Sequence, residues 1–151
     1  MDFQFTEDSA LILGTELGLD RLRRSRAAVG LPASASARNR WLLALHERGA
    51  PAANIPPRPI IRPALARPET REAMVRGLTA SCEAAARGDP EGVTEGLRQA
   101  GQAGADGIRG YIDAGVSPGN APSVAARKGF DKPLYETGEL YAAFSFEIIT
   151  Q

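Results

Sequence analysis

The 151-residue chain has one cysteine and one histidine, Cys82 and His46. A single cysteine excludes an intramolecular disulfide and is typical of a reducing compartment. His46 and Glu47 begin like the zinc signature H-E-x-x-H, but Ala50 stands where that signature needs its second histidine. One cysteine and one histidine cannot supply the ligands of a recognisable zinc site. We therefore expect no metal site, and the sequence gives no positive reason to expect an enzyme.

Long apolar runs and targeting signals are also missing. The longest apolar runs are a few residues long, whereas a membrane helix needs about 20. Residues 1–10 are acidic and lack the basic start and apolar centre of a signal peptide. We expect a protein made in a cytoplasm, without a membrane partner, and the length favours a single domain over residues 1–151.

The net charge is zero, but the charges are distributed unevenly. Residues 1–20 hold five acidic side chains and no basic one, and residues 21–76 hold twelve arginines against three glutamates. The remainder holds six bases against ten acids. We call residues 21–76 the basic block. One interpretation is that its arginines form ion pairs within the chain. The other is a basic face that meets the acidic face of a neighbouring copy, or nucleic acid.

Two helices are predicted in the middle of the chain, over about 67–88 and 89–115. Pro68 and Pro90 suit first helical positions, Asp89 suits an N-cap, and Gly88 suits a stop. The first helix has helically spaced apolar residues that place Cys82 in the core: Met74, Leu78, Cys82 and Ala85. The second has a longer apolar stripe: Val93, Leu97, Ala100, Gly104, Ile108 and Ile112. We expect the two helices to pack antiparallel.

The second helix contains six glycines, each of which costs up to about 1 kcal/mol relative to alanine. They are Gly92, Gly96, Gly101, Gly104, Gly107 and Gly110. Small residues allow another backbone to approach closely, so packing must offset their cost. The approaching element is either the chain's own sheet or a helix of a neighbouring subunit.

Patterns typical of β-strands lie before and after the two predicted helices. Residues 27–31 look like a strand that stops at Pro32, and residues 32–37 look like a loop. Residues 140–150 alternate, which predicts a strand with Leu140, Ala142, Phe144, Phe146 and Ile148 facing the core. Helices are expected from about Thr15 to Arg26 and over 123–128, while residues 40–51 fit either a buried strand or a helix. The predicted fold is α+β, with a small antiparallel sheet packed against two long antiparallel helices.

A proline-rich segment, NIPPRPIIRPAL at residues 54–65, precedes the first of these helices. Four prolines within eight residues predict a stiff extended arm that is neither helix nor central strand. The arm either straps the chain's own sheet or docks on an adjacent subunit. The candidate subunit-interface residues are Ile55, Pro56, Pro57, Arg58, Pro59, Ile60, Ile61 and Arg62.

Three stretches together resemble the neck and tail-completion proteins of tailed bacteriophages: ALHERGAP with NIPPRPIIRPAL, the GDPE junction, and NAPSVAARKGFDKPLYETGELYAAFSFEI. The family has an H-E-x-G-like element, an I-P-P-R-P-F-x-R-P segment and a closing P-S-T-x-x-x-K-G-x-D-K-P-L-x-x-T-G-x-L-like stretch. The matching residues here are His46, Glu47, Gly49, Ile55 to Pro59, Arg62, Pro63, Pro122, Ser123, Lys128, Gly129, Asp131 to Leu134, Thr137, Gly138 and Leu140. Ile60 stands where an aromatic is usual and Val124 where threonine is common. The resemblance covers about residues 41–150, and residues 1–40 are a variable part.

This resemblance implies a structural virion protein that joins the head connector to the tail as a ring of copies around the tail axis. Its implied partners are copies of itself, head-connector and tail proteins, and, non-specifically, DNA in the channel. Its implied location is the virion, and the host cytoplasm during assembly, with no catalysis and no cofactor. Within the same family the alternative is a tail terminator or minor tail protein. The alternative from another class is a small cytosolic enzyme or binding module that uses Cys82 or His46.

Overall fold

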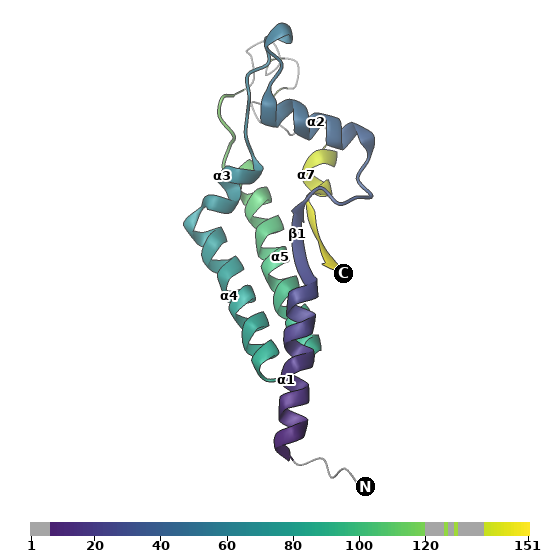
Figure 1. Ribbon diagram of the computed structural model, residues 1–151. Helices are drawn as coiled ribbons and strands as arrows, with labels where there is room; N and C mark the ends of the chain where they lie inside the picture. The colour runs from purple at the N-terminus through teal and green to yellow at the C-terminus, as the bar shows by residue number, and fades with distance from the viewer. Residues whose placement is uncertain (1–6, 120–125, 127–128, 130–137) are drawn as a thin grey trace.

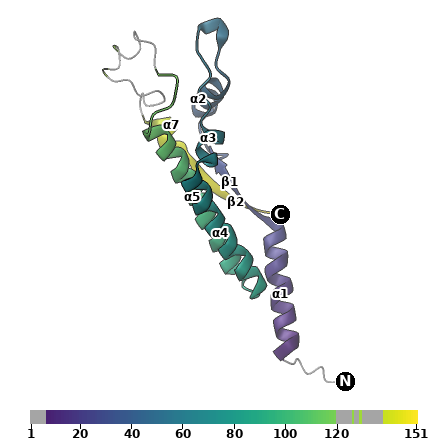
Figure 2. The ribbon, with the colours of Figure 1, turned by 90° about the vertical axis from the view of Figure 1, so that its left-hand side faces the viewer.

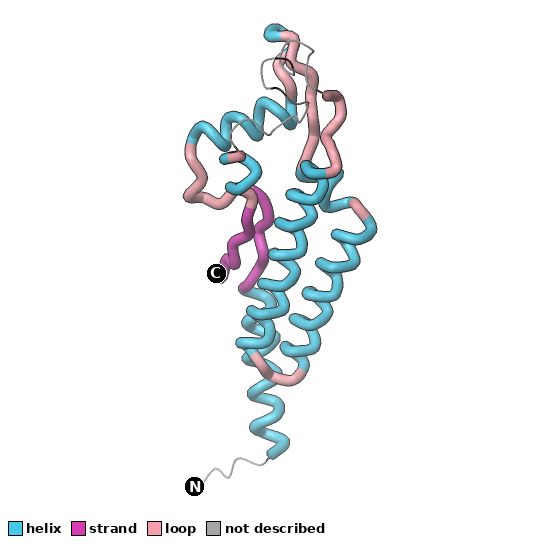
Figure 3. Tube along the Cα trace, turned by 180° about the vertical axis from the view of Figure 1, so that it is seen from behind, coloured by secondary structure: helices cyan, strands magenta, loops and turns pink. Residues whose placement is uncertain are grey.

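The computed structural model describes residues 7–119, 126, 129 and 138–151 (Figure 1). A long hairpin of two helices forms the body, a two-stranded ribbon lies beside it, and another helix crosses its upper end (Figures 1 and 3). The elements are α1 (Glu7–Arg24), β1 (Ser25–Gly30), α2 (Ala37–Arg48), the 3-10 turn η1 (Pro51–Ala53), α3 (Ile61–Ala66), α4 (Pro68–Ala86), α5 (Pro90–Asp113), α7 (Glu139–Ala143) and β2 (Ser145–Thr150). The predicted α+β class is confirmed. The short helix expected over 123–128 lies outside the described residues, apart from Ala126.

The α4–α5 hairpin is the predicted antiparallel pair. Asp89 caps α5 by accepting a hydrogen bond from the Gly92 amide at 2.8 Å, and Pro68 and Pro90 occupy the first turns of their helices. All six residues of the stripe predicted for α5 are buried, so that prediction is confirmed.

The stripe predicted for α4 is correct at Ala85, which is buried, and wrong at Leu78 and Cys82. Leu78 is 44% exposed and Cys82 is exposed, whereas the buried residues of α4 are mostly small: Thr70, Gly77, Ser81, Ala84 and Ala85. The reason is the close approach of α4 to α5. A β-carbon built at Gly77 would lie 2.5 Å from the Ala100 nitrogen, and Ser81 Oγ donates to the Val93 carbonyl at 2.8 Å. At this distance the larger side chains of α4 fit only on the outside.

The glycines of α5 pack within this chain. Gly96 faces the Ser81 backbone and Gly107 faces Thr70, both on α4. Gly101 lies under the Phe146 ring and Gly104 under Val29, both on the ribbon. The chain's own sheet and its own neighbouring helix therefore share these close contacts. Gly110 has no other part of the described chain within 4 Å of the position of a β-carbon.

The ribbon pairs β1 with β2 antiparallel, from Ser25 opposite Thr150 to Gly30 opposite Ser145. The strand predicted over 140–150 is correct only from Ser145, because Glu139–Ala143 form the helical turn α7. Gly138 adopts a left-handed conformation with φ of 76° and starts this turn. Leu140 and Phe144 are four residues apart, so the helical turn brings both into the core. Ala142, which was expected to face the core, is exposed.

The N-terminal segments also differ from their predicted bounds. Helix α1 starts earlier than expected, and the last residue expected in it, Arg26, belongs to β1. The segment that fitted either a strand or a helix is the helix α2, which Ser36 caps by accepting from the Asn39 amide at 3.1 Å. The loop expected over 32–37 spans 31–36. Among the residues described, no helix is long and apolar enough to cross a bilayer.

Two clusters form the core. The first joins α3, α5 and α7 around Ile60, Ile108 and Phe144. The second joins Ala84, Ala85, Val93 and Leu97 near the α4–α5 turn, with Leu22, Ala27 and Ile148 packed against them. Helix α1 contacts this second end, and its N-terminal half runs past the α4–α5 turn (Figures 1 and 2).

Candidate assembly site at the proline arm

The proline arm leaves the tip of a narrow loop and enters α3. Ala50 and Ile55 form a β-bridge that closes this loop around η1. Residues 56–60 belong to no helix or strand, in keeping with the prediction, but Ile60 already has helical backbone angles and Ile61–Ala66 are helical, so the expectation of an extended arm to residue 65 is wrong. Pro63 is only the third residue of α3. Because the first-turn amides of a helix have no intrahelical partner, a proline there removes no helical hydrogen bond.

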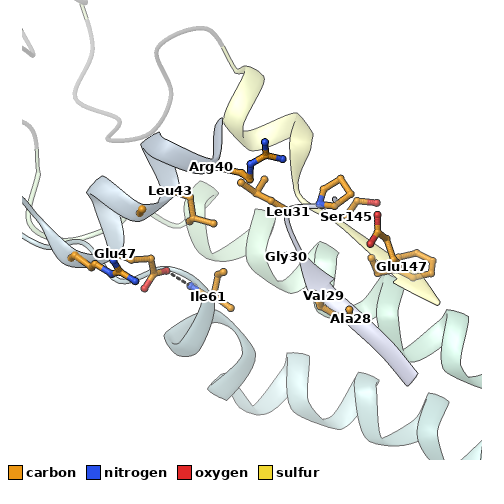
Figure 4. Close-up of a pocket in the computed structure, with 14 residues that line it drawn as sticks. Ala28, Val29, Gly30, Leu31, Arg40, Leu43, Glu47, Ile61, Ser145 and Glu147 are labelled. Carbon is orange, nitrogen blue, oxygen red and sulfur yellow. Dashed lines mark hydrogen bonds between the residues drawn. The ribbon is translucent and has the colours of Figure 1, made fainter. Parts of the chain in front are cut away.

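Glu47 of α2 connects that helix to the arm. Its Oε1 accepts hydrogen bonds from the backbone amides of Ile60 at 2.8 Å and Ile61 at 2.9 Å. Figure 4 shows the bond to Ile61. No side chain of α3's own sequence caps it, so Glu47 acts as its cap from outside. Its carboxylate is used by these two amides and forms no salt bridge with a described arginine. His46 is half-buried near the end of α2.

Backbone contacts next to Glu47 hold the arm at a second point. The His46 carbonyl accepts from the Arg58 amide at 2.6 Å. Gly49 has φ of 70°, and a β-carbon there would lie 2.7 Å from the Pro57 nitrogen. Glycine alone adopts this positive φ without strain and has no β-carbon to collide with Pro57. The end of α2 and the arm thus form one interlocked unit.

Two arm residues are anchored inside the chain. Arg58 is only 6% exposed, and its guanidinium donates from Nε to the Pro118 carbonyl at 2.7 Å and from NH2 to the Gly119 carbonyl at 2.8 Å. Ile60 is fully buried in the first core cluster. Arg58 and Ile60 are therefore held within their own chain, and their side chains are buried.

The rest of the predicted interface set remains at or near the surface. Ile55 and Ile61 are half-buried, and the exposed members are Pro56, Pro57, Pro59 and Arg62. That these residues contact an adjacent subunit stays a prediction.

A pocket of about 370 Å³ lies where α2, the ribbon and the start of α3 meet (Figure 4). Its apolar lining includes Val29, Leu31, Leu43, Ile61 and Phe146, and its charged lining consists of Arg40, Glu47, Arg48 and Glu147. Three of these four charges hold the backbone in place. Arg40 donates to the carbonyls of Ala33 and Ala35, Glu147 accepts from the Ala33 amide, and Glu47 caps α3.

The arginines of residues 21–76 are mostly unpaired. Arg24 and Arg67 form salt bridges with Asp20 and Glu69, and Arg40 and Arg58 bind carbonyls. The side chains of the other eight are exposed and have neither a hydrogen bond nor an ion pair with the part of the chain that the structure describes: Arg21, Arg23, Arg26, Arg38, Arg48, Arg62, Arg71 and Arg76. Among the described residues, internal ion pairing accounts for only two of the twelve arginines of residues 21–76.

Cys82 and His46 lie on different elements, α4 and α2. Cys82 is exposed, so the expectation that it lies in the core is wrong, and its neighbour Ser81 takes the core position instead. Within residues 7–119 and 138–151, no three His, Cys, Asp or Glu side chains come together as a metal site would require.

Comparison with models of known protein families, with curated proteins and with solved structures finds no match to this chain. The residues that resemble phage neck proteins can still be located in the fold. His46, Glu47, Gly49 and the arm form the interlocked unit, and Gly138 and Leu140 lie at the start of α7. The matching residues between Pro122 and Thr137 lie outside the described residues, apart from Gly129.

Proposed function

We propose that this protein is a structural component of a tailed bacteriophage, at the neck or the end of the tail. Copies of it assemble there between the head connector and the tail. The observation that carries the proposal is the contact between Glu47 and the amides of Ile60 and Ile61. It joins the H-E element to the proline segment, the two densest parts of the resemblance. Residues that match the family pattern and also contact one another in the fold support the proposal more strongly than matching residues scattered over the chain.

The exposed side chains also support an assembly role. Seven large apolar residues are exposed on α1, α2 and α4: Ile12, Leu13, Leu17, Leu19, Trp41, Val75 and Leu78. Eight arginines are exposed and unpaired within the described chain. Aromatic residues and arginine are enriched at protein interfaces, and arginine suits bidentate pairing with a partner's carboxylates. The proposal accordingly includes no catalytic residue and no cofactor.

Electron microscopy of lysates from the phage or prophage with this gene deleted tests the proposal. Separate DNA-filled heads and finished tails are expected if the protein acts at the neck. Overlong or absent tails would assign it instead to tail termination. The wild-type gene supplied from a plasmid should restore complete particles in either case. Normal infectious particles from the deletion strain would overturn the proposal.

A further inference from the structure

The exposed face of α1 carries both apolar and acidic residues. α1 packs on the lower end of the hairpin through Gly14 and Gly18, whose nearest neighbours are Gly88 and Ala85. On another side it exposes Leu13 (49%) and Leu17 (55%), with the acidic residues Glu16 and Asp20 at the same helical spacing. These four positions follow i, i+3, i+4, i+7 and therefore lie on one face. We call this the α1 face.

α4 exposes a face of opposite charge. Arg71, Val75, Leu78 and Cys82 follow i, i+4, i+7, i+11, and all four are exposed. Val75 is 51% exposed and Leu78 is 44% exposed, and Arg71 has no partner within the described residues. We call this the α4 face. The large side chains of α4 lie on this exposed face because its small residues pack against α5.

The two faces match when the helices are antiparallel. Asp20 then lies opposite Arg71, Leu17 opposite Val75, and Leu13 opposite Leu78. Both sets span seven residues, which is about 10 Å of helix. Apolar residues meet apolar residues along the contact, and the acid meets the unpaired arginine at its end. The salt bridge from Asp20 to Arg24 is exposed at the surface, so its rearrangement costs little.

The two faces of one chain cannot meet, because α1 already packs on the end of its own α4 through Gly14 and Gly18. We propose that the α1 face of one copy docks on the α4 face of the next copy. The overhang of α1 beyond the α4–α5 turn leaves the helix open to a neighbour (Figure 2). Two different faces then pair, so the contact is head-to-tail and continues into a ring or a filament. This deepens the proposed function and rests on it for the place of the assembly in a particle.

Size measurements on the purified full-length protein test the contact. The α1 variant carries Leu13→Ser and Leu17→Ser, and the α4 variant carries Val75→Ser and Leu78→Ser. Each should associate with itself about 100-fold more weakly than the wild type, because two apolar contacts are lost. An equimolar mixture of the two should form a dimer and nothing larger, because one intact α1 face meets one intact α4 face. Ile12→Ser with Leu19→Ser removes similar exposed apolar surface elsewhere on α1 and should leave assembly unchanged.

Charge exchange tests the predicted register. Arg71→Glu should weaken association, and adding Asp20→Arg in the same chain should restore it. High salt should weaken association of the wild type through the same pair. A wild-type protein that stays monomeric at millimolar concentration, or a mixture that forms no dimer, would overturn the contact. Because these measurements need no phage, they are independent of the deletion phenotype, so a failed contact and a failed function can be told apart.

Discussion

The Glu47 carboxylate lies 2.8 Å from the Ile60 backbone nitrogen and accepts its hydrogen bond. The same oxygen accepts from Ile61 at 2.9 Å, so one side chain of α2 satisfies two amides at the start of α3. Ile60 is also a core residue. The contact therefore fixes both the position of the arm and the insertion of its isoleucine.

Replacement of Glu47 should destabilise the fold. We expect Glu47→Ala to lower the free energy of unfolding by about 1–3 kcal/mol, because two amides lose a charged acceptor. Glu47→Gln keeps an oxygen acceptor and should lose less. Urea unfolding measures both, with Glu72→Ala as the control, since Glu72 is exposed and its loss should change stability by less than about 0.5 kcal/mol. Equal effects of Glu47→Ala and Glu72→Ala would contradict the capping role.

Ile60 should behave as a core residue rather than as a contact for a neighbour. Ile60→Ala should cost about 2–5 kcal/mol because it leaves a cavity beside Ile108 and Phe144. The same change at Ile12, which is 62% exposed, should cost far less. Thermal unfolding of the two variants at the same concentration gives the comparison. A small effect at Ile60 would mean that the arm does not strap the core.

Two glycines of α5 should respond in opposite directions to alanine. Gly96→Ala should destabilise the protein, because its β-carbon would collide with the Ser81 backbone. Gly110→Ala should stabilise it by up to about 1 kcal/mol, because the site is open and alanine favours helix. Denaturant midpoints measure both changes. Stabilisation by Gly96→Ala would argue against the close α4–α5 contact.

The thiol of Cys82 should react readily in the folded protein at concentrations too low for self-association, because its side chain is exposed in the single chain. A maleimide reagent should modify it at nearly the rate seen in denaturant. The control moves the thiol by one residue. In the variant Cys82→Ser with Ser81→Cys, the new thiol occupies a fully buried position and should be protected until unfolding. Protection of Cys82 in the native wild type would contradict the orientation of α4.

The contrast between α4 and α5 shows what the sequence could predict. In α5 the apolar residues Val93, Leu97, Ile108 and Ile112 are the buried ones, so periodicity identified the face correctly. In α4 the apolar pattern predicted that Leu78 and Cys82 are buried. The close contact between α4 and α5 has room only for small side chains, so those are the buried ones. A pattern of apolar residues shows which face can be buried in a core with ordinary spacing between helices. It does not show where two backbones come close together.

The arm was predictable in part for a related reason. Proline density correctly indicated a stretch without helix or strand over 56–60, but it could not show that Pro63 falls in the first turn of a helix. The cap of that helix comes from Glu47 in another element, and Arg58 is bound by carbonyls about 60 residues away. Their individual roles depend on contacts between distant segments.

The pairing of Ser25 with Thr150 has a consequence for the order of folding. The α4–α5 hairpin joins neighbours in the sequence, whereas the ribbon must bring together segments separated by most of the chain. Local contacts form quickly, and distant ones wait for slow loop closure. The hairpin should therefore form first, with the glycine-lined side of α5 open to water until β1 and β2 close over it. Because α1 runs directly into β1, this last step also sets the direction in which α1 points. A newly made chain would then become competent to join a neighbour only at the end of its own folding.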